Sequence, residues 1–291
     1  MVTILRSQNS RSQADLQDAG QIRLLALDID GTIAGKSNQL SQPILEAVAA
    51  VQAKGIAVAI ATGRMYRAAL RFHHTLNLRL PLIAYQGAWI QDPITNQRAW
   101  HTPVAAPHAL NLLDYFEQPD LRQRLSVHFY IDDDLYVREL TPDTEAYVQR
   151  SGITPIAVGD LRSVLDRAPT KVLALSADTG LMQTVLADLQ GMVNPADLHI
   201  TTSVATFVEA THPHATKGHA LKRLAEEELG LRPEQVMAIG DNCNDLEMIQ
   251  YAGLGIAMGD APEIVKATAN WIAPTVEADG AAIAIQKFLL S

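Results

Sequence analysis

The feature that most constrains the fold is a series of short, continuously apolar segments, each ending at a group of polar residues. Three of them lie at 22–27, 56–61 and 81–85, and the stretches between them are typical of helices. The first of these helices begins near Ser41 and Pro43, an N-cap followed by an early proline. Continuous apolar strands that alternate with helices indicate a parallel sheet covered on both faces. The sequence therefore predicts an α/β fold with a Rossmann-like parallel-sheet core.

This alternation is interrupted in the middle of the chain. Segment 89–100 and the residues around 132–134 are typical of hairpins, and helical segments lie beside them. The first pattern returns with apolar segments at 236–239 and 254–258. Helices beside hairpins are typical of an inserted α+β cap domain. The predicted organisation is a disordered tail at 1–20, the first half of the core at 21–87, the cap at 88–208 and the second half of the core at 209–291.

Charge and cysteine content limit the classes of function. The chain of 291 residues has 23 Lys and Arg against 32 Asp and Glu, a net charge of −9. Such a surface repels phosphate backbones, so general nucleic-acid binding is excluded. Cys243 is the one cysteine, which excludes an intramolecular disulfide. No apolar segment approaches the roughly 18 residues of a membrane span. We expect a cytoplasmic protein without a membrane partner, either a monomer or a homodimer.

Polar groups that follow the apolar segments point to phosphate chemistry. The carboxyl ends of parallel strands line one crevice, so the groups at 28–32, 62–64 and 240–245 can converge there, joined by Lys217. Several carboxylates packed together repel unless a cation joins them, and oxygen ligands suit Mg²⁺. A carboxylate shielded by that cation can attack phosphorus as a nucleophile. Gly31 provides a turn that would let Asp30 reach the leaving oxygen.

These groups resemble the four motifs of the haloacid dehalogenase superfamily of phosphohydrolases. The motifs read Asp28-Ile29-Asp30-Gly31-Thr32, Ala61-Thr62-Gly63-Arg64, Lys217-Gly218 and Gly240-Asp241-x-x-Asn244-Asp245. Their form is similar to the Cof-type subfamily, and the insert lies where that superfamily carries its C2 cap. The resemblance covers about residues 21–291. Each motif alone is weak, whereas all four in order make a specific signal.

The resemblance implies a role for each matching residue. Asp28 would be the nucleophile that forms an aspartyl-phosphate, and Asp30 the acid that protonates the leaving alcohol and then activates water. Thr62 and Lys217 would hold the transferring phosphoryl group. The implied phosphate-binding residues are Thr62, Gly63, Arg64, Lys217 and Asn244. The implied Mg²⁺ ligands are Asp28, Asp30 through its backbone carbonyl, Asp241 and, in a supporting position, Asp245.

Simpler structural roles exist for the same residues. Asp-Gly is common in solvated turns, Thr62 can cap a helix, and a lysine in the position of Lys217 is often exposed. The ordered set of motifs favours the functional interpretation.

The chain departs from the usual family pattern at two positions. Gln86-Gly87-Ala88 stands where relatives carry Asn-Gly-Ala, and Gly259-Asp260-Ala261 where they carry Gly-Asn-Ala. The first position points toward the substrate region in relatives, so the recognition of the leaving group is in question. Side chains of the cap set the substrate, and further candidates for substrate recognition are His128, Tyr130 and Glu209.

Three hypotheses about function follow. The first is a Mg²⁺-dependent phosphatase that hydrolyses a small phosphorylated metabolite. Sugar phosphates are the leading substrate class, and phosphorylated cofactors such as flavin mononucleotide or pyridoxal phosphate rank second. The second is a phosphomutase that passes the phosphoryl group to a sugar hydroxyl. The third is a non-catalytic protein that binds a phosphorylated metabolite.

Overall fold

A computed structural model describes residues 22–291, so the predicted tail at 1–20 lies outside the described residues. The core contains a five-stranded parallel sheet in the order β14-β13-β12-β1-β2. Its strands are β1 (Leu24–Leu27), β2 (Ala57–Ile60), β12 (Val236–Gly240), β13 (Leu254–Ala257) and β14 (Trp271–Ile272). The first third of the chain therefore supplies β1 and β2, and the last third supplies the other three strands of the sheet.

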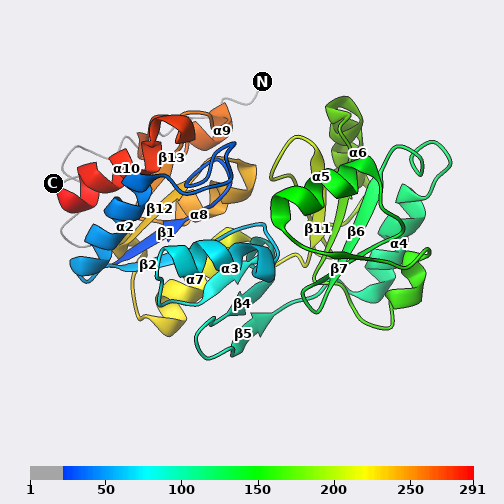
Figure 1. Ribbon diagram of the computed structural model, residues 1–291, viewed down its shortest axis with the longest axis horizontal. Helices are drawn as coiled ribbons and strands as arrows, with labels where there is room; N and C mark the ends of the chain where they lie inside the picture. Colours follow the sequence, from blue (N-terminus) through cyan, green and yellow to red (C-terminus); the bar gives the residue numbers. More distant parts are fainter. Residues whose placement is uncertain (1–21) are drawn as a thin grey trace, which may run out of the picture.

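Helices cover both faces of this sheet (Figure 1). Alternate strand residues point to opposite faces, so Leu25 and Leu27 of β1 pack on one side and Leu24 and Ala26 on the other. The first face packs against α2 (Gln42–Ala53), α3 (Tyr66–Thr75) and α10 (Gly280–Ile285). The second face packs against α7 (Lys217–Arg223) and α8 (Leu246–Tyr251). The short α9 (Glu263–Lys266) follows β13.

A hairpin extends the core beside β3 (Leu82–Ala84). A parallel bridge joins Ala61 to Ile83, and β3 pairs antiparallel with β4 (Trp89–Gln91), which pairs with β5 (Arg98–His101). Ile90 packs in the same apolar cluster as the second face of the core sheet. The boundary of the insert at residue 88 stays a prediction, and this strand pairing favours a boundary after β5 instead.

The cap contains a six-stranded sheet in the order β10-β11-β9-β6-β7-β8. Every pairing in it is antiparallel apart from β7 with β8. Its strands are β6 (Ser126–Ile131), β7 (Asp134–Val137), β8 (Pro155–Ala157), β9 (Lys171–Leu175), β10 (His199–Thr201) and β11 (Phe207–Thr211). Its helices are α4 (Ala106–Phe116), α5 (Pro142–Ser151) and α6 (Thr179–Met192). No local pattern in the sequence predicts β8, β10 or β11, which are short or lie among polar residues.

The two faces of the cap sheet have different partners. Phe129 and Val172 pack with α4 and α6 in a cluster belonging to the cap alone. Tyr130 and Leu173, on the opposite face, join the apolar cluster of the core. The cap sheet therefore presents one face to the carboxyl ends of the core strands, beside the core in Figure 1. Across residues 22–291, no helix combines the length and the apolar character needed to span a bilayer.

Candidate active site

Asp28 lies at the carboxyl end of β1, against a buried lysine. Its backbone amide still donates to Ile239 of β12, so the sheet fixes the position of the side chain. Lys217 begins α7, and its Nζ lies 2.5 Å from Oδ1 of Asp28 and 2.6 Å from Oδ1 of Asp245. The Lys217 side chain is 1% exposed. The structure thus brings together the first, third and fourth motifs around one ammonium group.

The loop after β12 is organised by Asp245. Its Oδ2 accepts hydrogen bonds from the backbone amides of Asp241 (2.9 Å) and Asn242 (3.1 Å). With Oδ1 on Lys217, both of its oxygens already have partners. Asp241, by contrast, accepts a long hydrogen bond of 3.4 Å from Thr32 and otherwise lies against the carboxylate of Asp28 among residues 22–291. The geometry therefore leaves Asp241 free to take a further ligand and gives Asp245 a supporting position.

Gly31 allows the first and fourth motifs to approach. Its φ of +82° lies in the left-handed region, where a side chain is strained. A Cβ at this position would collide with the carboxylate of Asp241. A larger residue at position 31 would therefore be strained and would displace the Asp241 carboxylate from the turn after β1.

Burial and mutual repulsion shift the pKa values of the cluster. Burial, reinforced by Asp245 and Asp30, raises the pKa of Asp28 to about 7 although Lys217 opposes the shift. Burial and the neighbouring Asp28 and Asp245 raise the pKa of Asp241 to about 9. Burial alone would lower the pKa of Lys217, but the two carboxylates outweigh it and raise that pKa.

A divalent cation fits this donor set. Carboxylate oxygens of Asp28, Asp241 and Asp245 lie within 4.8 Å of one another. Three carboxylates against one ammonium leave two formal negative charges, which one Mg²⁺ would neutralise with ligands it prefers. The carboxylate of Asp30 points elsewhere, and its predicted contribution through the backbone carbonyl stays a prediction.

Asp30 is bound by two arginines. Arg64 donates to both of its oxygens, at 2.7 and 2.6 Å, and Arg150 of the cap helix α5 donates to Oδ1 at 3.0 Å. Burial would raise the pKa of Asp30, but the hydrogen bonds and charges of Arg64 and Arg150 outweigh it and lower that pKa. Asn38 bonds to both arginines, accepting from Arg64 and donating to the backbone of Arg150. Asp30 therefore lies at a contact between core and cap.

The second motif forms the floor of the site between core and cap. Thr62 is 1% exposed, and its hydroxyl accepts from the amide of Arg64 at 3.2 Å. Gly63 leaves space that the amide of Gln86 fills. Gln86 in turn accepts from Asn244 at 3.0 Å. The structure thus joins Asn244 to Gln86, while Lys217 bonds to Asp28 and Asp245.

These residues line a cavity of about 660 Å³ between the core and the cap. Its core side includes Asp28, Asp30, Thr62, Gly63, Arg64, Asp241 and Asn244. The cap contributes residues from α5, β9 and β11. Asp260, one of the two departures from the family pattern, also lines it. The volume is within the range of pockets that hold small organic ligands, roughly 300–1,000 Å³.

Sequence reasoning missed most of the cap side of this cavity. Arg150, Lys171, Tyr147 and Phe207 line it, and of the three cap candidates only Glu209 does. His128 and Tyr130 are fully buried in the cap. A cavity formed between two domains leaves no periodic pattern in the sequence, so no local signal marks these residues.

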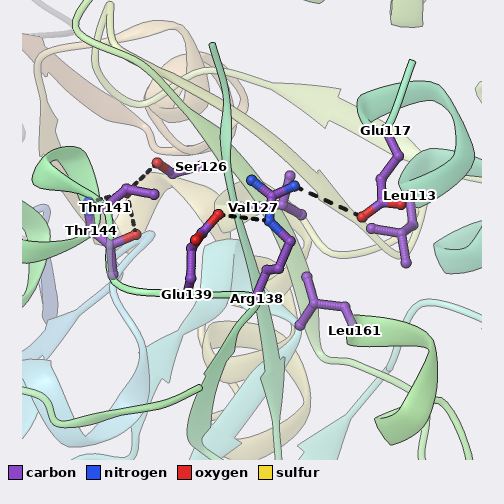
Figure 2. Close-up of a pocket in the computed structure, with 9 residues that line it drawn as sticks. All are labelled: Leu113, Glu117, Ser126, Val127, Arg138, Glu139, Thr141, Thr144 and Leu161. Atoms are coloured by element: carbon purple, nitrogen blue, oxygen red, sulfur yellow. Dashed lines mark hydrogen bonds and ion pairs between the residues drawn. The ribbon is translucent and has the colours of Figure 1, made fainter. Parts of the chain in front are cut away.

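A second pocket lies within the cap and is already filled by its own contacts. Figure 2 shows Ser126 beside Thr141 and Arg138 beside Glu139. The hydroxyl oxygens of the first pair are 2.5 Å apart, and Nε of Arg138 lies 3.1 Å from Oε1 of Glu139. Its volume is about 10 Å³, room for roughly one water. We assign this pocket no role in ligand binding.

Comparison with known proteins connects this geometry to a family. A profile of haloacid dehalogenase-like hydrolases matches residues 25–285. The 5-amino-6-(5-phospho-D-ribitylamino)uracil phosphatase YcsE of Bacillus subtilis is 30% identical, covering 92% of this chain and 96% of its own. The pyridoxal phosphate phosphatase YbhA of Escherichia coli is 27% identical, covering 92% and 98%.

A solved structure agrees with this assignment. The crystal structure of a haloacid dehalogenase-like hydrolase from Bacteroides thetaiotaomicron superimposes with a TM-score of 0.79 at 25% identity. It covers 91% of this chain and 99% of its own. The match extends over both halves of the core and over the insert. The chain therefore belongs to the haloacid dehalogenase-like hydrolases and is a phosphoric monoester hydrolase with an inserted cap, as the Cof-type resemblance predicts.

Proposed function

We propose that the protein is a Mg²⁺-dependent phosphatase that hydrolyses a small phosphorylated metabolite through an aspartyl-phosphate. The observation that carries this proposal is the carboxylate of Asp28, fixed by Lys217 at the end of β1 and open to the cavity. Bound Mg²⁺ would neutralise the carboxylate cluster and withdraw charge from the phosphoryl oxygens.

The residues present can carry both halves of the reaction. An oxygen of Asp28 forms a bond to phosphorus while the bond from phosphorus to the leaving alcohol oxygen breaks. Lys217 and Thr62 stabilise the charge of the transferring phosphoryl group. Water then attacks phosphorus, the bond to Asp28 breaks, and inorganic phosphate leaves with the carboxylate restored.

Asp30 supplies the proton in the first half and recovers one from water in the second. In the structure both of its oxygens face guanidinium groups, which favours the ionised form. Arg150 belongs to the cap, so opening of the cap removes one of these partners. We infer that Asp30 becomes a proton donor only after substrate entry has displaced an arginine from it.

The substrate class is also part of this proposal. The printed names of relatives include phosphatases of a ribitylaminouracil phosphate and of pyridoxal phosphate, while one neighbour in fold is described as a sugar phosphatase. These support a small phosphate monoester, and sugar phosphates stay a prediction. A cytoplasmic location and a monomer or homodimer likewise stay predictions.

The experiment is phosphate release from a panel of metabolite phosphates, with and without Mg²⁺. Wild type is compared with Asp28→Asn, and Asp197→Asn, an exposed aspartate of the cap, serves as the control. We expect Mg²⁺-dependent release that the first variant abolishes and the control retains. Full activity of Asp28→Asn would refute the aspartyl-phosphate mechanism.

A further inference from the structure

The cavity has two chemically different sides. The core side holds the charged groups of the phosphate site. The cap side is mixed. It carries apolar side chains, among them Tyr147 of α5 and Phe207 of β11 with Leu175 and Val204, and also polar ones, among them Lys171, Glu209, Ser176 and Thr206. The phosphoryl group belongs on the core side, so the leaving group must extend along the cap side.

Two aromatic rings form the centre of this wall. The ring centroids of Tyr147 and Phe207 lie 6.0 Å apart with 57° between the ring planes. Both side chains pack against the main apolar cluster yet stay partly exposed in the cavity. Partly exposed rings of this kind gain most from a partner that covers them, and a flat π-system is the partner that aromatic faces prefer.

A buried ion pair lies at the same side of the cavity. Nζ of Lys171 is 2.8 Å from Oε2 of Glu209, and the two side chains are 4% and 1% exposed. Lys171 also donates to the carbonyl of Gly63 in the second motif, at 2.8 Å. Removing two charges from water is costly, so a buried ion pair contributes little to the stability of the fold. A pair of this kind beside a cleft is therefore a candidate for a functional role.

The ion pair continues as a row of hydrogen bonds toward the phosphate site. Gln86 donates to Oε1 of Glu209 at 3.3 Å and accepts from Asn244 at 3.0 Å. Oδ1 of Asn244 is buried and has no hydrogen-bond partner among residues 22–291. Lys171, Glu209 and Asn244 line the cavity, whereas Gln86 lies behind them and positions the last two. Ser203 also donates to Oε1 of Glu209. The row therefore places an ammonium group, a carboxylate and an unpaired amide oxygen beside the cavity, and a ligand would bond to them by replacing present contacts such as that of Ser203.

We propose that Lys171, Glu209 and Asn244 recognise the polar edge of the leaving group, and that Tyr147 and Phe207 contact its ring, one by stacking and the other edge-to-face. The substrate class is then a phosphate monoester whose leaving group carries a flat heteroaromatic ring with hydrogen-bonding atoms on one edge. A bare sugar could bond to the polar groups but would leave the two aromatic rings without a flat partner. This inference rests on the proposed phosphatase function and specifies its substrate.

The test compares esters that share a phosphorylated chain and differ in the ring. Flavin mononucleotide carries a heteroaromatic ring on a ribityl phosphate, and D-ribitol 5-phosphate is the same chain without it. We expect kcat/KM to be about 10-fold or more higher for the flavin ester. Acetyl phosphate, which needs no leaving-group pocket, reports whether the phosphate site works.

Variants assign the preference to these residues. Phe207→Leu and Tyr147→Leu keep apolar volume and should lower the ratio of kcat/KM between the two esters by about 2- to 10-fold. Glu209→Gln should lower it by about 10-fold. Tyr136→Leu, which removes a ring from the cap cluster outside the cavity, is the control and should leave the ratio unchanged. A ratio is insensitive to the fraction of folded enzyme, so partial unfolding cannot imitate the result.

The outcomes separate this inference from the proposed function. Hydrolysis of acetyl phosphate together with a ratio near one, or above one for ribitol 5-phosphate, would overturn the inference and leave the phosphatase standing. Absence of all hydrolysis would overturn the phosphatase. A second measurement uses binding instead of hydrolysis: the Asp28→Asn protein is titrated with flavin mononucleotide, and quenching of the flavin fluorescence reports contact with the ring. Quenching that Phe207→Leu weakens supports the inference, and absence of quenching overturns it.

Discussion

Replacement of Lys217 by methionine tests how the site is held together. The ammonium group lies 2.5 Å from Asp28 and 2.6 Å from Asp245, and its side chain is 1% exposed. Methionine keeps most of the length but removes the charge, so two buried carboxylates lose their partner. Breaking a buried pair in this way costs about 3–5 kcal/mol, which corresponds to a fall in Tm of roughly 6–10 °C.

The assay is thermal unfolding in EDTA at pH 7, with phosphate release measured in parallel. Lys222→Met is the matched control, because Lys222 is exposed on the same helix. Activity of Lys217→Met should fall by about 100-fold or more, since the proposed donor to the phosphoryl oxygens is lost. Adding Asp245→Asn to Lys217→Met should recover part of the stability, because it removes one unpaired charge. A Tm for Lys217→Met equal to that of the control would refute the reasoning.

Three further predictions concern pH, metal and the cap. Burial and, to a smaller extent, the charge of Lys171 lower the pKa of His128 from 6.5 to about 3. Between pH 6.5 and pH 3 this histidine is therefore protonated in the unfolded chain but neutral in the folded protein. Stability should therefore fall by up to about 4–5 kcal/mol from pH 6.5 to pH 3, measured by urea unfolding, and His128→Gln should flatten this slope. Mg²⁺ at a hundredfold excess over its Kd should stabilise the protein by about 2.7 kcal/mol, and retention of that gain in Asp241→Asn would contradict the assigned cluster. Arg150→Met removes a half-exposed ion pair between the cap and Asp30, so it should lower the free energy of unfolding by at most about 1 kcal/mol. The loss of this contact should nevertheless increase the radius of gyration in solution scattering, and an unchanged radius would argue against a cap contact there.

The sequence predicted the fold class and the family because the signals for both are local. Buried parallel strands read as continuous apolar segments, and each motif follows its strand directly, as at Asp28 and Asp241. The parallel sheet, the separate cap and the family assignment confirm that reading. The predicted site residues Asp28, Asp241, Asp245 and Lys217 do lie together, although their catalytic roles stay predictions.

The tertiary structure decided what the cap contributes. The strands β10 and β11 are stabilised by pairing with each other and with β9, so their own residues carry little local signal. The contact of Arg150 with Asp30 spans 120 positions, and that of Lys171 with Gly63 spans 108. Such contacts depend on how two domains meet, which no periodicity within one segment encodes. The sequence by itself determined the sheet and the motif residues at the ends of its strands, whereas only the folded arrangement of core and cap determined the surface that faces them.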